Sequence, residues 1–202
     1  MRREELTELH YIAHMDNVQS IIRHGILSNR RAAKIPHTSV AMQVVQDRRA
    51  DVVVPEGRKL QEYVNLYICA RNPMLFKRLG QHLDLCVLQV STDVLDLPGV
   101  VVTDANASSD YVRFAEAPGG LSIVDRELTL AEYWTDPDPI VQWKKKSAKC
   151  AEVLVPDRVA PQFIMGAYVS CQDAMDRLSG LGTGIPVRIN AHMFFQVRTE
   201  SW

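Results

Sequence analysis

The amino-acid sequence predicts a mixed α+β fold built around a mainly antiparallel sheet. Three observations lead to this prediction: many short segments are rich in strand-forming residues, the helical patterns are few and short, and neither a Rossmann G-x-G-x-x-G fingerprint nor a P-loop follows a strand. The chain has 202 residues, of which 47% are hydrophobic and 23% charged. This length and composition suit one folded domain spanning residues 1–202.

The first half of the chain predicts a strand, a short helix and a second strand. Residues 9–13 form the first strand, and Asp16 offers an N-cap for a helix that Gly25 ends. Residues 28–56 are mixed in character and predict no clear element. Residues 63–70 are rich in β-formers and predict a strand that Pro73 terminates.

The second half predicts mostly strands, with two short helical segments. The expected strands are residues 84–91, 100–103, 151–155, 161–170 and 186–190. Residues 128–134 favour a short helix or turn, and residues 171–178 favour a helix. The lysine-rich segment at residues 144–149 is expected to be a loop that leads into the strand at 151–155.

Composition excludes several classes of protein. The net charge of −1 at pH 7 does not indicate a nucleic-acid binder, so any basic surface must be local. The four cysteines form no C-x-x-C pair, which favours reduced thiols in or near the core over a metal site or a disulfide framework. No apolar run has the length of a signal peptide or of a membrane span, so we expect a cytoplasmic protein without a membrane partner.

Two groups of polar residues in the first half are candidates for a binding site. Tyr11 to His14, followed by Asn17, would deliver polar groups to a cleft in front of a short helix, or would form an ordinary solvated strand end. The pair Arg48-Arg49 offers guanidinium forks suited to phosphate, although neighbouring arginines are usually surface residues.

Two further groups come from later strands. Tyr63, Asn65 and Tyr67 share one strand face, where the tyrosines would stack on a planar ring or complete the rim of the core. Glu152 begins the strand after the lysine-rich segment, in a position that allows partial burial or a simple exposed terminus. The lysines could neutralise phosphates of a polyanion.

Taken together, these segments resemble the DarT family of DNA ADP-ribosyltransferase toxins. The family's opening motif, like Y-H-I-T-H-x-x-N-L-x-x-I-L-x-x-G, is similar to residues 10–18 with Ile21 and Gly25. Its arginine pair resembles Arg48-Arg49, and its D-Y-V-P-F-Y-F-x-x-R-S-P-M-L block resembles residues 62–75. Its A-E-F-L-V and P-V-R-I motifs resemble residues 151–155 and 186–189. These pieces occur in order over most of the chain.

The resemblance implies an ADP-ribosyltransferase fold, with two packed, mainly antiparallel sheets and short helices around a central NAD cleft. It places the catalytic glutamate at Glu152 and the catalytic arginine at Arg49. The expected NAD-binding residues are Tyr11, Ile12, Ala13, His14, Asn17, Ser20, Ser28, Arg49, Tyr63 and Tyr67. The expected DNA-binding residues are Arg71, Lys144, Lys145, Lys146 and Lys149.

The function implied by the resemblance is NAD-dependent mono-ADP-ribosylation of a base in single-stranded DNA, by a monomeric toxin whose partner is a DarG-like macrodomain antitoxin. No metal is expected. The alternatives are an enzyme of the same fold that modifies RNA or protein, and a catalytically silent nucleic-acid-binding module. The target base, thymine or guanine, stays open.

Two features depart from the patterns of the family and fold. Tyr11 and Ala13 replace the H-x-T of many transferases, so His10, His14 or the Tyr11 hydroxyl would hold the ribose. Cys150 replaces a glutamine two residues before the catalytic glutamate, a position that helps to choose the acceptor.

Overall fold

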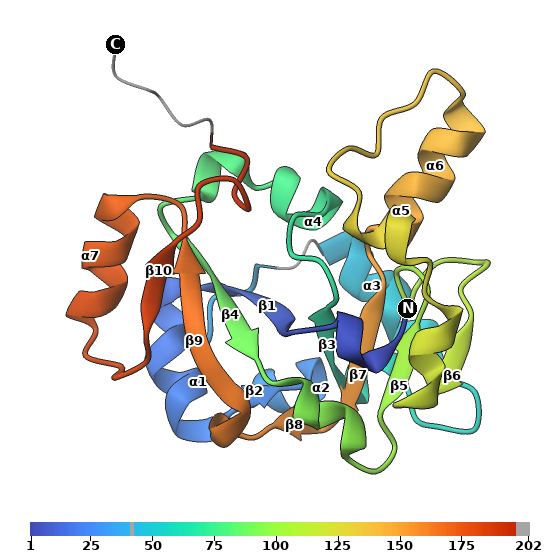
Figure 1. Ribbon diagram of the computed structural model, residues 1–202. Coiled ribbons are helices and arrows are strands. Elements are labelled where there is room, and N and C mark those ends of the chain that lie inside the picture. Colours follow the sequence, from blue (N-terminus) through green and yellow to red (C-terminus); the bar gives the residue numbers. More distant parts are fainter. Residues whose placement is uncertain (41–42, 197–202) are drawn as a thin grey trace.

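The computed structural model describes residues 1–40 and 43–196. Strands from this part of the chain form an eight-stranded sheet in the order β10-β9-β4-β1-β3-β7-β5-β6 and a two-stranded sheet, β2-β8 (Figure 1). The strands are β1 (Leu9–His14), β2 (Ile26–Leu27), β3 (Tyr63–Tyr67), β4 (Leu85–Val90), β5 (Val101–Thr103), β6 (Phe114–Glu116), β7 (Glu152–Pro156), β8 (Arg158–Val159), β9 (Ile164–Val169) and β10 (Val187–Ile189).

The helices are short and lie around the sheets. The α-helices are α1 (Val18–His24), α2 (Asn29–Ala32), α3 (Gln43–Asp51), α4 (Pro73–Phe76), α5 (Arg126–Leu130), α6 (Pro139–Ala148) and α7 (Gln172–Gly180). The 3-10 turns are η1 (Arg3–Glu5), η2 (Met15–Asn17), η3 (Leu60–Glu62), η4 (Leu79–Gln81), η5 (Thr92–Asp96), η6 (Gly119–Ile123) and η7 (Pro161–Phe163). In Figure 1, α6 projects from the body on the side opposite α7.

The pairing of the strands confirms the predicted fold class. Among the named strands of the described chain, β9 and β10 run parallel and the other pairs run antiparallel. The strands that the sequence predicts are present, with ends shifted by up to three residues. Their side chains are mostly apolar, and every residue of β4 is buried, so the pattern of β-branched and aliphatic residues is sufficient to find them.

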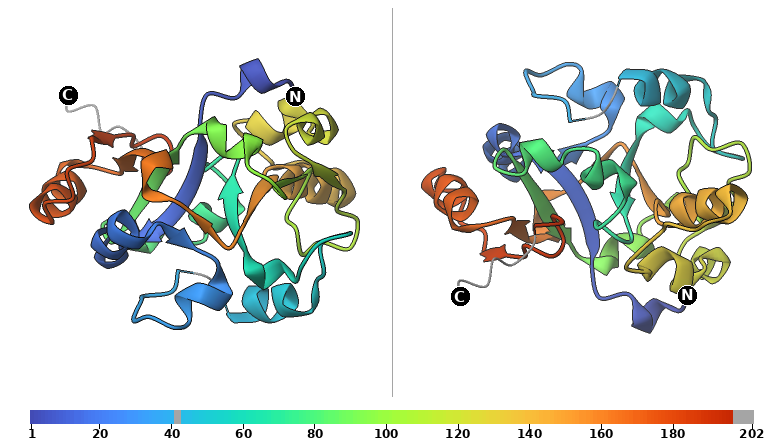
Figure 2. Two further views of the ribbon diagram at one scale, coloured as in Figure 1. Left: turned by 90° about the horizontal axis from the view of Figure 1, so that it is seen from below. Right: turned by 90° about the horizontal axis from the view of Figure 1, so that it is seen from above.

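The large sheet divides where β1 meets β3. These two strands register at a single Cα pair, His10 with Tyr67, whereas β1 registers with β4 at six pairs and β3 with β7 at five. We call β10-β9-β4-β1 the first half of the sheet and β3-β7-β5-β6 the second half; Figure 2 shows them as two groups of strands on either side of this junction. Both halves contribute buried residues to one main core, among them Leu9, Leu88, Leu66 and Val153.

The start of α1 differs from the prediction, and its end agrees with it. Asp16 is not the N-cap, because η2 precedes the helix and the His14 imidazole accepts a hydrogen bond from the Asp16 amide at 3.3 Å. Gly25 ends the helix with φ of 84°. A Cβ at Gly25 would lie 2.2 Å from the Val159 carbonyl oxygen, so glycine permits both the turn and the contact with β8.

Four helices lie where the sequence predicted none. α2 and α3 fall within the mixed segment at residues 28–56. The expected basic loop is instead the last part of α6, which begins with Pro139 at its first turn and Asp138 accepting from two backbone amides. In the same way, Pro73 opens α4 behind the N-cap Asn72. None of the helices in residues 1–40 and 43–196 has both the length and the apolar character that crossing a membrane requires.

Candidate active site

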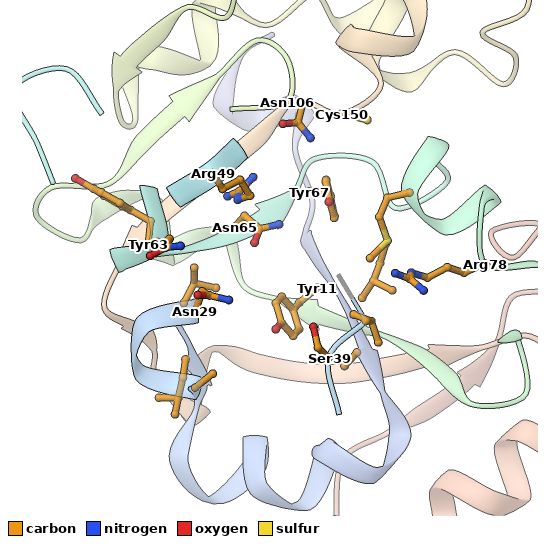
Figure 3. Close-up of a pocket in the computed structure, with 18 of the residues that line it drawn as sticks. Tyr11, Asn29, Ser39, Arg49, Tyr63, Asn65, Tyr67, Arg78, Asn106 and Cys150 are labelled. Atoms are coloured by element: carbon orange, nitrogen blue, oxygen red, sulfur yellow. The ribbon is translucent and has the colours of Figure 1, made fainter. Parts of the chain in front are cut away.

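A cavity of about 260 Å³ opens between the two halves of the sheet, next to the junction of β1 and β3. We call this cavity the cleft. Tyr11 lies on the wall from the first half, and Tyr63, Asn65 and Tyr67 lie on the wall from the second half (Figure 3). β1 and β3 pair at only one position, so their main chains form no continuous ladder there. Side chains from both strands line the cavity between them.

The first half supplies Tyr11, Ile12 and Ala13 to the cleft, together with Asn17 from η2. Asn17 donates to the Thr38 carbonyl at 2.7 Å and accepts from the Thr38 amide at 2.9 Å. This pair of hydrogen bonds ties the segment 37–40 to the end of β1, and the same segment lines the cleft. Burial raises the pKa of Tyr11, so its phenol remains a neutral hydrogen-bond donor.

The second half supplies the charged centre of the site. The Arg49 Nη1 lies 3.1 Å and 3.3 Å from the two carboxylate oxygens of Glu152, which is fully buried. The Glu152 amide also donates to the Thr103 hydroxyl at 3.2 Å, which fixes the start of β7 against β5. Arg49 lines the cleft, and Glu152 lies behind it. The sequence separation of 103 residues explains why sequence reasoning could not predict this contact.

Burial is the main influence on the Glu152 carboxyl and raises its pKa above the ordinary value, although Arg49 and the Ala107 amide oppose this shift. Tyr67 lies opposite Glu152 in the β3–β7 register. Burial, followed by the charge of Glu152, raises the pKa of Tyr67 as well. The site therefore combines one carboxylate, one guanidinium and two neutral phenols, a set suited to stabilising charge that develops during a reaction.

The structure brings together most of the residues that we expected to bind NAD. Tyr11, Ile12, Ala13, Asn17, Arg49, Tyr63 and Tyr67 all line the cleft.

Three others lie elsewhere. His14 caps η2, and Ser20 is half-buried on α1, outside the cleft lining. Ser28 is buried beside a neighbouring hollow, and its hydroxyl has no hydrogen-bond partner within residues 1–40 and 43–196. His10 pairs with Glu8 at 3.0 Å, so Tyr11 is the β1 side chain placed to act in the cleft.

The expected DNA-binding residues have different surroundings. Arg71 donates to the His192 carbonyl, and its guanidinium lies 4.0 Å from the centre of the Phe195 ring, so it anchors the C-terminal segment. Lys145 forms an ion pair with Asp136 at 2.7 Å. Lys144 and Lys146 are exposed on α6, and Lys146 also reaches the cleft.

Lys149 corrects the expectation of a four-lysine patch. It is 1% exposed, and its ammonium donates to the Ala131 carbonyl at 2.6 Å and to the Cys69 sulfur at 3.1 Å. It lies at the C-terminal end of α6, where the chain turns into the buried start of β7. A lysine in this position cannot reach a phosphate in solution.

Sequence reasoning missed several residues that line the cleft. Asn106 comes from the β5–β6 connection, Lys77 and Arg78 follow α4, and Thr38 lies in the segment tied to Asn17. These positions are set by tertiary contacts and carry no periodic signal. Cys150, which also lines the cleft, does carry a signal in the sequence, as a departure from the family pattern just before the motif at residues 151–155.

Comparison with protein families gives a match over residues 10–195 to the family described as ssDNA thymidine ADP-ribosyltransferase, DarT. The chain is 33% identical over 206 residues to a DNA ADP-ribosyl transferase–DNA ADP-ribosyl glycohydrolase fusion protein from Thermosipho africanus (strain H17ap60334). This alignment covers 96% of the chain and 50% of the fusion protein, so the chain spans about half the length of that relative.

Solved structures show the same likeness. Thermosipho africanus DarTG in complex with ADP-ribose superposes with a TM-score of 0.82 at 30% identity, over 94% of this chain and 51% of that one. Thermus sp. 2.9 DarT in complex with ADP-ribosylated ssDNA superposes with a TM-score of 0.78 at 25% identity, over 94% of this chain and 96% of that one. The same Thermus protein in complex with carba-NAD⁺ gives a TM-score of 0.76 at 25% identity, over 94% and 98%.

Proposed function

The chain belongs to the DarT family, and on that basis we propose that it transfers ADP-ribose from NAD⁺ to thymidine in single-stranded DNA. The observation that carries this proposal is the buried Arg49–Glu152 pair, which lies against a cleft walled by Tyr11, Tyr63 and Tyr67. The family description names thymidine, and the Thermus relative binds both carba-NAD⁺ and ADP-ribosylated ssDNA.

The composition of the cleft suits NAD⁺ as a substrate. Aromatic and apolar side chains from both halves form its walls, as in most cavities for planar ligands. Arg49 and Arg78 lie in the same space (Figure 3), and Lys77 also lines it. Their positive charge matches a pyrophosphate. Tyr11 replaces the histidine of many related transferases, and its neutral hydroxyl is the group we assign to the ribose of the donor.

Glu152 is the residue that we assign to the reacting ribose. Cleavage of the glycosidic bond leaves positive charge on that sugar, and a fixed carboxylate nearby lowers the energy of the transition state. Glu152 is held by Arg49 and by the Ala107 amide, so it is oriented before the reaction begins. Arg49 uses Nη1 for this contact, and a guanidinium has further donors with which to bind a phosphate or an anionic base.

We assign DNA binding to the surface of α6. Lys144 and Lys146 are exposed there, next to Trp143, which is 49% exposed. Trp143 meets Tyr111, 81% exposed, edge to face with ring centres 6.2 Å apart. Exposed aromatic rings beside lysines suit single-stranded DNA, because bases stack on the rings while the lysines neutralise phosphates. Single-stranded DNA also presents its bases without the cost of opening a duplex.

The biological role follows from the same relatives. We propose that the chain acts in the cytoplasm as the toxin of a toxin–antitoxin pair. The relative from Thermosipho joins a DNA ADP-ribosyl transferase to a DNA ADP-ribosyl glycohydrolase in one protein. A DarG-like glycohydrolase that removes ADP-ribose from DNA is therefore the antitoxin we propose for this chain.

Mass spectrometry of oligonucleotides after incubation with NAD⁺ tests the proposal. We expect one ADP-ribose on single-stranded oligonucleotides that contain thymine, and none on matched oligonucleotides in which every thymine is replaced. Glu152→Gln serves as the inactive control. Modification of guanine would correct the assigned base, labelling of RNA or protein alone would replace the assigned substrate, and DNA binding without nicotinamide release would indicate a silent binding module.

A further inference from the structure

The connection between β5 and β6, residues 104–113, brings one polar side chain into the cleft close to Glu152. This residue is Asn106, and it lies between Ala105 and Ala107, which are buried. The Ala107 amide donates a hydrogen bond to the Glu152 carboxylate. Asn106 is therefore the direct neighbour of a residue that contacts Glu152, and Figure 3 shows it at the same end of the cleft as Cys150.

Hydrogen bonds within the connection fix the orientation of the Asn106 side chain. Its Oδ1 accepts from the Ser108 amide at 2.9 Å and from the Ser108 hydroxyl at 2.7 Å. Because a backbone amide can only donate, the atom that faces Ser108 is the oxygen, and the amide nitrogen lies on the other side. Within residues 1–40 and 43–196, no group accepts a hydrogen bond from this nitrogen. Asn106 thus offers an unused donor to the cleft.

The main chain next to Asn106 is anchored to the strand that carries Glu152. Thr103 lies opposite Glu152 in the β5–β7 register. The Thr103 hydroxyl donates to the Ala105 carbonyl at 2.7 Å and accepts from the Glu152 amide at 3.2 Å. These contacts set the position of the Asn106 amide relative to the Glu152 carboxylate. A donor that is held in place before a ligand arrives loses little conformational entropy on binding.

The same connection continues to the surface that we assigned to DNA. Tyr111 lies in it and meets Trp143 of α6, and both rings are exposed. Lys146 on α6 and Cys150, which follows that helix, line the cleft together with Asn106. A base that enters the cleft from the α6 surface would therefore pass the Asn106 amide.

We propose that Asn106 selects the target base by donating a hydrogen bond from its amide nitrogen to a carbonyl oxygen of thymine. This inference rests on the proposed function and adds to it the residue that recognises the base. Thymine presents carbonyl oxygens at its positions 2 and 4, which accept hydrogen bonds, whereas cytosine has an amino group at position 4, which donates. A donor that faces another donor in a closed site leaves both without a partner, and this penalty disfavours cytosine.

Thymine suits the Asn106 donor better than the nicotinamide of NAD⁺ does. The carboxamide of nicotinamide has a carbonyl oxygen and an amino group, so a side chain that satisfies it must accept as well as donate. The Asn106 oxygen already accepts two hydrogen bonds from Ser108, and only its donor remains. If Asn106 bound nicotinamide instead, replacing it would weaken NAD⁺ binding.

Replacement of single oxygen atoms in the substrate tests the proposal. Single-stranded oligonucleotides with one thymine are compared with the same oligonucleotides carrying 2-thiothymine or 4-thiothymine, because sulfur accepts hydrogen bonds more weakly than oxygen. The measured quantity is the ratio of the transfer rates for the oxygen and the sulfur substrate. For one of the two thio bases, this ratio should fall by about twofold to tenfold in Asn106→Ala, the range for loss of one hydrogen bond. Any effect of sulfur on the reactivity of the base itself is common to both proteins and cancels.

Two further variants separate the donor from its surroundings. Asn106→Asp keeps an oxygen that accepts from Ser108 but has no amide nitrogen, so its ratio should fall as in Asn106→Ala. Asn190→Ala is the matched control, since the Asn190 side chain also accepts from a backbone amide, that of Met193 at 3.0 Å, and lies outside the cleft lining. It should keep the ratio of the unmodified protein. Unchanged ratios in both Asn106 variants, or an equal fall in Asn190→Ala, would overturn the proposal.

Calorimetric measurement of NAD⁺ binding without DNA gives an independent readout. Asn106→Ala should bind NAD⁺ within about twofold of the unmodified protein, below the effect of a lost hydrogen bond. A larger loss of NAD⁺ affinity with an unchanged ratio would assign Asn106 to the donor and overturn the proposal. If the unmodified protein modifies thymine and the ratio stays the same in the variants, only this inference fails. If it modifies no thymine, the proposed function fails as well.

Discussion

Two acidic residues stand at the start of strands in the two halves of the sheet, and their surroundings differ. Glu8 precedes β1 in the first half and contacts His10 at 3.0 Å, the Gln89 amide at 2.7 Å and the Tyr168 hydroxyl at 3.5 Å. Burial raises its pKa, but the hydrogen bonds from His10 and Gln89 outweigh that effect and lower it. Glu152 starts β7 in the second half, and burial raises its pKa in spite of Arg49.

The difference separates a carboxylate with a structural role from the one that we assign to the reaction. Three side chains from three segments contact the Glu8 carboxylate, so burial of its charge costs little free energy. The same contacts hold β1, β4 and β9 together. Glu152 depends mainly on one arginine that also lines the cleft. A carboxylate with few partners beside a substrate cavity retains the capacity to stabilise a new positive charge.

The largest effect is expected from removing the carboxylate that we assign to the reaction, Glu152. Glu152→Gln should reduce the rate of ADP-ribosyl transfer by at least about 10²-fold, since one preorganised electrostatic group is removed. Glu8→Gln is the matched control in the other half and should stay within about threefold of the unmodified rate, the range of a mutation remote from the chemistry. Single-turnover kinetics with thermal unfolding of each variant make the comparison. Equal losses in the two variants would remove the distinction between the carboxylates.

A smaller but still severe loss is expected at Arg49. Arg49→Lys keeps the charge but not the guanidinium, whose Nη1 contacts both oxygens of Glu152 while its other N–H groups can serve a ligand, so we expect a loss of about tenfold or more. Arg48 is exposed on the same helix, and Arg48→Lys should behave like the unmodified protein. Parallel kcat and KM measurements decide this prediction, and similar sensitivity at the two positions would contradict the assignment of Arg49.

The pH dependence should show the same contrast between the two acids. Transfer needs the Glu152 carboxylate, so the rate should rise with pH through the raised pKa of Glu152, above the ordinary carboxyl value of about 4.3. The two carboxyl groups should have opposite effects on how the free energy of unfolding changes with pH. Glu8, with its lowered pKa, stabilises the fold above the unfolded pKa, and this contribution is lost as pH falls through the folded one. Glu152 destabilises the fold as pH rises through its folded pKa.

A pH–rate profile measures how the transfer rate depends on pH, and unfolding curves at several pH values measure the two stability effects. Glu8→Gln should lose less stability than the unmodified protein as the pH falls, because it lacks the carboxylate whose contribution disappears in acid. Its rate profile should keep the acid limb. An acid limb at or below the ordinary carboxyl range would contradict the raised pKa of Glu152.

The smallest effect is expected on the outer surface of the second half. Replacing both Lys144 and Lys146 by alanine should weaken binding of single-stranded DNA and lower the slope of log affinity against log salt by roughly 0.7 for each phosphate that is no longer neutralised. Lys145→Ala is the control, because Lys145 is already paired with Asp136. Fluorescence titrations at several salt concentrations measure the slopes. An unchanged slope in the double variant would move the DNA path away from α6.

The elements that the sequence predicted well are those whose signal is local. The strands follow from runs of β-branched and aliphatic residues, and Gly25 ends α1 because the backbone there needs a positive φ. α4 and α6 were missed although both carry a local signal, an Asn or Asp cap followed by proline at the first turn. Proline in this setting is easily interpreted as a chain break, and it is also a common start of a helix.

The rest could not be predicted, because it depends on contacts far apart in the chain. The four lysines before Glu152 look alike in sequence, yet one is buried, one is ion-paired and two are exposed. Nothing local distinguishes Lys149, whose partners come from Cys69 and Ala131. The motif match proposed Glu152 and Arg49 as candidates, whereas their contact, and the position of Glu152 behind Arg49, required the structure.

The single pair that joins β1 to β3 has a consequence for how a substrate is recognised. Beyond His10, the described part of β1 has ladder partners on β4 alone. One side of β1 is therefore unpaired, as in an edge strand, although β1 lies in the middle of the sheet. Within residues 1–40 and 43–196, the main chain of β1 beyond His10 has no ladder partner on the β3 side, and a ligand could pair with it in the manner of a strand added at an edge. Recognition through main-chain atoms would be independent of side-chain identity, so it is compatible with Tyr11 and Ala13 at positions where related transferases have histidine and a hydroxyl residue.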